Sequence, residues 1–192
     1  DKVASGLELG SVTVNAYARN FQAAAVGIIG IALAQSAYSL LSQAAAKREM
    51  RRFWAYLQKG TLLSVGLSVL ATVALILLAR VAAWLVHLTE PRVLSTFLVV
   101  LSIYALSIPL ESVNHLLLRA WYSLKNTKVP AVTSVLSGVI AIVFAWMFAP
   151  AYGVYALAVG FLVGQGVQTV GLWGLITKRV KFRIQCSSAS SR

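Results

Sequence analysis

The chain has 192 residues, of which 59% are hydrophobic and only 11% are charged, and its mean hydropathy is +0.79. Soluble globular domains carry about 25% charged residues. The single cysteine, Cys186, excludes a disulfide-stapled scaffold, and the composition excludes a disordered tail and a collagen-like fibre. A membrane protein is the class that is left.

The formal net charge of +12 gives the chain a strongly basic character. Such a charge would favour nucleic acid as a partner if the basic residues gathered on one face of a soluble fold. Here they are scattered between long uncharged stretches. We therefore expect membrane lipids, and the anionic inner leaflet in particular, as their partner, and no nucleic acid.

Uncharged stretches of membrane-crossing length divide the chain. A bilayer core about 30 Å thick requires about 20 apolar residues of helix. The longest stretch, 129–177, contains the turn signal Pro150-Ala151-Tyr152-Gly153 and is read as two helices joined by a hairpin. The sequence thus predicts an all-α polytopic membrane helix bundle with transmembrane helices at about 11–41, 61–88, 93–122, 130–149 and 154–176.

The distribution of lysine and arginine among the loops predicts the orientation of the bundle. Basic residues concentrate in the segment 47–59, in the loop around Lys125 and Lys128, and after residue 177. By the positive-inside rule, these segments are cytoplasmic and the N-terminus of the chain lies outside. We expect a multi-pass protein of the bacterial cytoplasmic (inner) membrane, with a cytoplasmic C-terminus.

Two segments outside the spans have a character of their own. In 47–59, Met50, Phe53, Trp54 and Leu57 repeat at helical spacing opposite a basic face, which favours a helix lying along the inner leaflet over a plain extension into water. Residues 179–192 form a basic, Ser-rich tail.

Because the chain begins at Asp1 and no span precedes the first one, we expect a fragment of a longer protein.

The first span carries a polar stripe in its outer half. Asn15, Arg19 and Gln22 follow helical spacing on one face. The stripe fits the wall of a wet cavity in which Arg19 attracts an anionic group such as a phosphate. In the alternative interpretation, Arg19 extends to the outer headgroups. The polar amides of Asn15 and Gln22 favour the cavity.

The third span carries Glu111, His115 and Arg119 at intervals of four residues, with Asn114 beside them. A charge inside a membrane span is costly and is a functional hypothesis by default. The ladder could bind a diphosphate through His115 and Arg119, or exchange protons through Glu111 and His115. Alternatively it is an intrahelical row of salt bridges, with Arg119 reaching the interface.

Small residues predict close helix packing at two places, the Gly160/Gly164 pair of the fifth span and Gly27 with Gly30 in the first. The chain shows no enzyme signature: it has five acidic residues, no His/Cys cluster with metal spacing and no phosphate-cradling glycine loop. We expect no catalytic activity, no cofactor and no metal.

Several strings together resemble the MurJ/MviN lipid II flippases. These are Asp1-Lys2-Val3-Ala4-Ser5-Gly6-Leu7, then Asn15-Ala16-Tyr17-Ala18-Arg19, and Arg119-Ala120-Trp121-Tyr122-Ser123-Leu124-Lys125-Asn126-Thr127-Lys128-Val129-Pro130. The last is similar to the family's link between helices ten and eleven. The resemblance covers about residues 1–178. It rests on the order and spacing of the strings, since each string alone is a weak signal.

The resemblance implies that residues 1–178 form most of the second lobe of a two-lobed transporter. Such a transporter flips the undecaprenyl-diphosphate-linked peptidoglycan precursor, lipid II, across the membrane by alternating access, and the missing N-terminal lobe is expected on the same polypeptide. It also implies a substrate-binding role for Arg19, for Asn20 at the family's usual arginine position, and for His115, where the family often has lysine.

Some residues depart from the family pattern. Ala25 and Ser39 stand where the eighth helix of the family has prolines, and Glu111 is not a family residue. Two other functions therefore stay open. One is a flippase for another lipid-linked glycan, of O-antigen or teichoic type, and the other is a non-transporting membrane scaffold.

Overall fold

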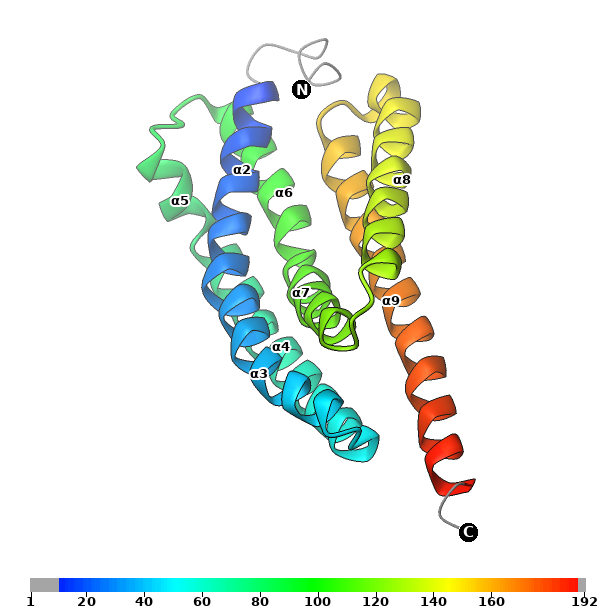
Figure 1. The fold of residues 1–192 in the computed structure, drawn as a ribbon. Helices are drawn as coiled ribbons and strands as arrows, with labels where there is room; N and C mark the ends of the chain where they lie inside the picture. The colour runs from blue at the N-terminus through cyan, green and yellow to red at the C-terminus, as the bar shows by residue number, and fades with distance from the viewer. Residues whose placement is uncertain (1–10, 190–192) are drawn as a thin grey trace.

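A computed structural model describes residues 11–189, which are folded as a bundle of helices without a strand (Figure 1). The string 1–7 and the last residues of the tail, 190–192, lie outside the described residues. In chain order the elements are α2 (Ser11–Val26), the π-helical segment η1 (Gly27–Ile31), α3 (Ala32–Ala46), α4 (Met50–Leu77), α5 (Ala79–Leu85), α6 (Pro91–Leu106), α7 (Ile108–Ser123), α8 (Lys128–Tyr152) and α9 (Tyr155–Ala189).

Five helical stretches are long and apolar enough to cross a membrane, the number that the sequence predicts. Their limits differ most from the predicted ones in the second span, which the prediction of 61–88 places too late because α4 ends at Leu77 and α5 is a separate short helix, and in the fifth, which continues past residue 176. The stretches are Val12–Ala46, Met50–Leu77, Pro91–Ser123, Lys128–Tyr152 and Tyr155–Gln185.

The first long helix changes its winding at η1, between α2 and α3, and Figure 1 shows it bending there. Single π-helical turns inside α-helices are rare and frequently mark functional sites. Gly30 of this segment is buried, and a Cβ atom on it would lie 2.8 Å from Ser112 Oγ and 3.0 Å from Ser112 Cα in α7. The close packing predicted at Gly30 is therefore present, whereas the prediction is wrong for Gly27, where an added Cβ atom would meet nothing within 4 Å.

The structure differs from the prediction of a separate interfacial helix over 47–59. Residues from Met50 belong to α4, which continues without a break through Gly60. The apolar face of this segment is buried in the protein, with Phe53 and Leu57 fully covered in a core cluster that also contains Trp121. An apolar stripe has the same spacing whether lipid or another helix covers it, and here helices cover it.

The tail also differs from its prediction. Helix α9 does not end near residue 176 but continues to Ala189. Between Gly174 and Ala189 the sequence has no glycine or proline to stop the helix, and it contains good helix formers such as lysine, arginine and glutamine.

Each end of the bundle has its own core cluster of buried hydrophobic side chains. One contains Leu41, Phe53, Leu117, Trp121 and Leu172, from α3, α4, α7 and α9. The other joins α2, α5, α6 and the start of α9, around the fully buried Phe97, Val100 and Leu101. Helix α7 contributes to the first cluster and α6 to the second, and the two consecutive helices lie at the centre of the bundle, so a polar side chain on them meets the surrounding helices.

Helices α8 and α9 form a tight hairpin. Gly153 ends α8 with φ of 57°, a left-handed conformation that glycine adopts without strain. Along the hairpin, Cβ atoms on Gly160 and Gly164 would each lie 2.8 Å from a backbone carbonyl oxygen of α8, those of Ala141 and Ser137 respectively. This confirms the close packing predicted from the Gly160/Gly164 pair.

Candidate functional site

The polar stripe of the first span faces the interior of the bundle. It lies on α2, where the neighbouring Val14 and Ala18 are buried in the core cluster around Phe97. Gln22 is completely buried, whereas the Arg19 side chain keeps 33% of its surface exposed. The stripe is thus covered by protein at its inner end and more open at Arg19.

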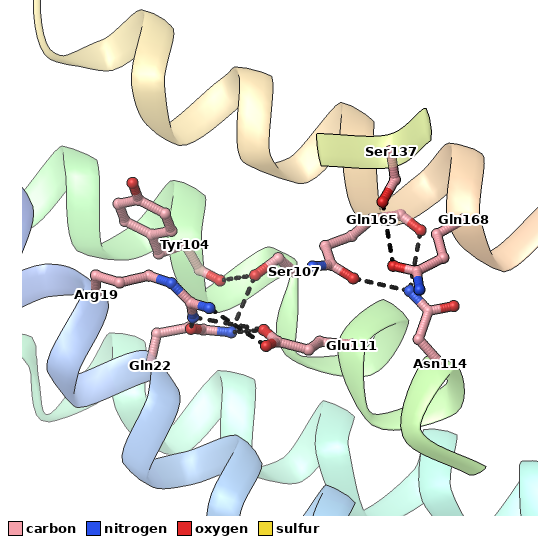
Figure 2. A network of polar contacts seen from close by, with 9 residues as sticks. All are labelled: Arg19, Gln22, Tyr104, Ser107, Glu111, Asn114, Ser137, Gln165 and Gln168. Atoms are coloured by element: carbon pink, nitrogen blue, oxygen red, sulfur yellow. Dashed lines mark hydrogen bonds and ion pairs between the residues drawn. The ribbon is translucent and has the colours of Figure 1, made fainter. Parts of the chain in front are cut away.

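Arg19 forms an ion pair with Glu111 of α7, 92 positions along the chain (Figure 2). Arg19 Nη2 lies 3.3 Å from Glu111 Oε1, and Nη1 lies 3.5 Å from Oε2. The guanidinium therefore meets the carboxylate at two points, but at distances longer than the 2.7–2.9 Å of close charge-assisted hydrogen bonds. Glu111 is the more covered partner, with 15% of its side chain exposed.

Gln22 connects the two charged groups. Its Oε1 accepts a hydrogen bond from Arg19 Nη1, and its Nε2 donates to Glu111 Oε2 over 2.7 Å and to Ser107 Oγ over 3.2 Å. Ser107 Oγ in turn donates to the Tyr104 carbonyl over 2.7 Å. The buried amide thus has partners for both its donor and its acceptor, as a buried polar group requires.

Two aromatic rings complete the surroundings of Arg19. Its guanidinium carbon lies 4.2 Å from the ring centroid of Phe161 in α9, within the range of a cation–π contact. Phe161 packs against Tyr104 with ring centroids 5.6 Å apart, and the Tyr104 hydroxyl donates to Asn15 Oδ1 over 2.8 Å. Arg19 therefore stands where α2, α7 and α9 meet, and its partners are side chains of the bundle.

The structure brings together four of the residues that the sequence singles out: Asn15, Arg19, Gln22 and Glu111. Asn20 is exposed and lies outside this network. His115 is partly buried one helical turn from Glu111, and no hydrogen bond among the described residues joins it to Arg19 or Gln22. Glu111 is therefore not in an intrahelical row of salt bridges, because across residues 11–189 its ion pair is made with Arg19.

A second polar cluster lies one turn further along α7. Asn114, which is 2% exposed, donates from Nδ2 to Gln165 Oε1 over 2.8 Å and accepts from Thr169 Oγ1 over 2.9 Å. Gln168 of α9 donates to Ser134 Oγ of α8 over 2.9 Å, and its Oε1 accepts a hydrogen bond from Ser137 Oγ over 3.3 Å, the contact drawn in Figure 2. These bonds tie α9 to α7 and to α8.

Sequence reasoning missed Ser107, Tyr104 and Phe161 as parts of the Arg19 surroundings. Ser107 precedes Glu111 by four residues, so a helical face drawn through Glu111 in both directions includes it. No comparable signal exists for the two aromatic residues, because tyrosine and phenylalanine are ordinary residues of an apolar helix. Residues 11–189 contain no group of three or more His, Cys, Asp or Glu side chains that could hold a metal ion.

Comparisons with known proteins give a consistent result. The family model described as "Lipid II flippase MurJ" matches residues 2–190. A solved structure described as "Lipid II flippase MurJ, inward closed conformation" superposes with a TM-score of 0.80 at 18% sequence identity. The match covers 91% of this chain and 38% of that one, so the chain spans well under half the length of the structure it resembles. The search of curated proteins finds no match.

Proposed function

Because this chain belongs to the MurJ lipid II flippase family, we propose that it forms the second lobe of a transporter that flips lipid II across the bacterial cytoplasmic membrane by alternating access. The chain is a multi-pass membrane protein with five helices of membrane-crossing length. In the proposal, the first lobe of this transporter corresponds to the part of the solved structure that this chain does not cover. The basic loops face the cytoplasm, and the start of the first span lies outside.

The observation that supports this proposal best is the position of Arg19. A cation within a membrane-length helix is expensive and is retained where it faces a partner or a wet surface. Here the guanidinium lies between Glu111 and Phe161, inside the bundle, and a third of the side chain is still exposed. A guanidinium presents a planar fork of donors that matches phosphate oxygens, which is the chemistry required to hold the diphosphate of lipid II.

The other polar residues have supporting roles in the proposal. Asn15 and Gln22 hold the surroundings of Arg19, and the exposed Asn20 contributes a further contact to the substrate headgroup. Glu111 and His115, one turn apart on α7, are the candidates for coupling the cycle to an ion. The prenyl tail of the substrate stays in lipid.

A complementation experiment tests the function. The complete transporter containing this chain is expressed in cells depleted of their own lipid II flippase, and peptidoglycan synthesis is measured. We expect rescue by the natural protein, strong impairment by Arg19→Ala, and normal rescue by the matched variant Arg80→Ala, which removes an exposed arginine from α5.

Each alternative function predicts a different result. A flippase for another lipid-linked glycan would leave peptidoglycan synthesis unrescued but restore export of that glycan. A membrane scaffold would tolerate Arg19→Ala and His115→Ala without loss of its function. If rescue did not depend on Arg19, the proposed role of Arg19 in binding the substrate would be excluded.

A further inference from the structure

We propose that Glu111 acts as an internal competitor for the phosphates of the substrate: it pairs with Arg19 while the site is empty, and it gives up Arg19 when the diphosphate arrives. This inference rests on the proposed function and adds to it a residue that sets the affinity for the anionic headgroup. Glu111 is the only acidic residue within the five membrane-length helices of the described chain.

The contact distances show which part of the network is free to exchange. Glu111 Oε2 is held by Gln22 at 2.7 Å, whereas its oxygens lie 3.3 and 3.5 Å from the Arg19 nitrogens. Arg19 is also the more exposed member of the pair, at 33% against 15%. The guanidinium is thus the partner that an anion from outside the network can reach. Its Nη1 stays with Gln22 Oε1, and its Nη2, 3.3 Å from Glu111, is the donor that exchanges, whereas the carboxylate keeps its close hydrogen bond to Gln22.

The anchoring of Glu111 does not depend on Arg19. Gln22 is completely buried, and its Nε2 is also bonded to Ser107 Oγ, which is fixed in turn by the Tyr104 carbonyl. If Arg19 turns toward a phosphate, the carboxylate keeps its short hydrogen bond to Gln22. The buried charge is therefore not left without a partner, which would otherwise oppose the exchange.

Arg19 also has a support that does not depend on Glu111. Its guanidinium lies over the ring of Phe161 at 4.2 Å, and this contact acts on the flat face of the group. The donors at the edge of the guanidinium can then change partners while the group stays on the ring. The exchange requires a change of hydrogen-bond partner, and no helix has to unfold.

Competition of this kind suits a transporter. A phosphate and a carboxylate repel one another at a single guanidinium, so the Glu111 charge lowers the affinity for the substrate. It also favours release, because the carboxylate is in place to recapture Arg19. Transport requires binding that is strong enough for entry and weak enough for exit.

The test uses the complete transporter in detergent, with the variants Glu111→Gln and Glu111→Ala. The second variant covers the possibility that the first does not fold, since Gln22 keeps Ser107 as a partner in both. Glu90→Gln is the matched control, because Glu90 is exposed outside the membrane-length helices. The probes are inorganic pyrophosphate, undecaprenyl diphosphate and phosphatidylglycerol, and the readouts are the Kd of each probe and the rate of flipping in vesicles.

We expect both Glu111 variants to bind the diphosphate probes roughly two- to fivefold more tightly, the ratio expected from removing a partly exposed ion pair. We expect flipping to become slower because release is hindered, and the Glu90→Gln control to match the natural protein. Tightening with both diphosphates indicates recognition of the diphosphate itself. Tightening with the lipid alone indicates that the lipid must present it, and either result supports the inference.

Unchanged or weaker binding in the Glu111 variants would overturn the inference, provided that the natural protein binds the diphosphates and Arg19→Ala does not. In that case Glu111 only links α2 to α7, and the proposed function stands. Equal tightening of phosphatidylglycerol would also overturn it, because the site would then be a general anion surface. If the natural protein binds neither diphosphate, the proposed function fails together with the inference.

Discussion

Gln22 donates to Glu111 over 2.7 Å, the shortest link that α2 makes to the carboxylate of α7, and it does so from a completely buried position. This hydrogen bond joins two helices that are far apart in the sequence. It makes the amide of Gln22, as well as the two charges, a determinant of how α2 and α7 fit together.

The first prediction concerns this amide. In Gln22→Leu, a side chain of similar size replaces the amide, and Glu111, Arg19 and Ser107 each lose a partner. We expect a loss of about 2–3 kcal/mol in the free energy of unfolding, since a buried charged group is left with fewer hydrogen bonds. Thermal unfolding in detergent measures it. Gln35→Leu, at an exposed position of α3, is the control and should change little; equal melting temperatures would contradict this account.

The second prediction concerns the α8/α9 hairpin. In Gly164→Ala, the new methyl group would lie 2.8 Å from the carbonyl oxygen of Ser137, so the two helices have to move apart. We expect a destabilisation of about 1–3 kcal/mol, as is typical of overpacking. In Gly166→Ala, two residues further along the same helix, nothing lies within 4 Å of the methyl group. That variant should be neutral or slightly stabilised, and melting temperatures in detergent distinguish the two.

How much of this architecture the sequence could predict depends on whether a feature is local. The five spans follow from gaps in the charge pattern, and the shared face of Arg19 and Gln22 follows from their spacing along one helix. The close packing at Gly164 is also local in origin, because a glycine pair leaves a flat surface on any helix.

The sequence could not predict which helices pack against one another. Glu111 lies four residues from His115, and this spacing suggested an intrahelical ladder, whereas its ion pair is with Arg19 of another helix. The same limit of sequence-based prediction applies to Phe53 and Leu57. Their spacing indicates an apolar helix face, but it does not indicate whether lipid or protein covers that face. A single sequence gives the face of each helix but does not say which faces meet.

The third prediction concerns the π-helical segment. In Gly30→Ala, the added Cβ would lie 2.8 Å from Ser112 Oγ and 3.0 Å from the Ser112 backbone, which forces η1 and α7 apart. We expect a lower melting temperature and slower flipping, whereas Gly27→Ala, with nothing within 4 Å, should leave both unchanged.

A second substitution separates the two contacts at Gly30. Ser112 Oγ is buried and has no hydrogen-bond partner in the described part of the chain, so Ser112→Ala removes the nearest obstacle at little cost. The double variant Gly30→Ala/Ser112→Ala should recover part of the lost stability, because the backbone contact at 3.0 Å persists. Strictly additive losses would show that Gly30 and Ser112 do not press on one another as the structure has them.

The last prediction concerns the ring beneath Arg19. In Phe161→Leu, the guanidinium loses a cation–π contact of about 0.5–2 kcal/mol and becomes free to leave the position in which it meets an anion. We expect pyrophosphate binding by the complete transporter to weaken a few-fold, which is opposite in sign to the effect of Glu111→Gln. Phe161→Tyr keeps the ring and should keep the affinity. Phe182→Leu, at a 67% exposed position of the same helix, controls for the loss of a phenylalanine elsewhere. If Phe161→Leu bound pyrophosphate as well as the natural protein does, the ring would serve only to pack against Tyr104, and Arg19 would be positioned by Glu111 and Gln22 alone.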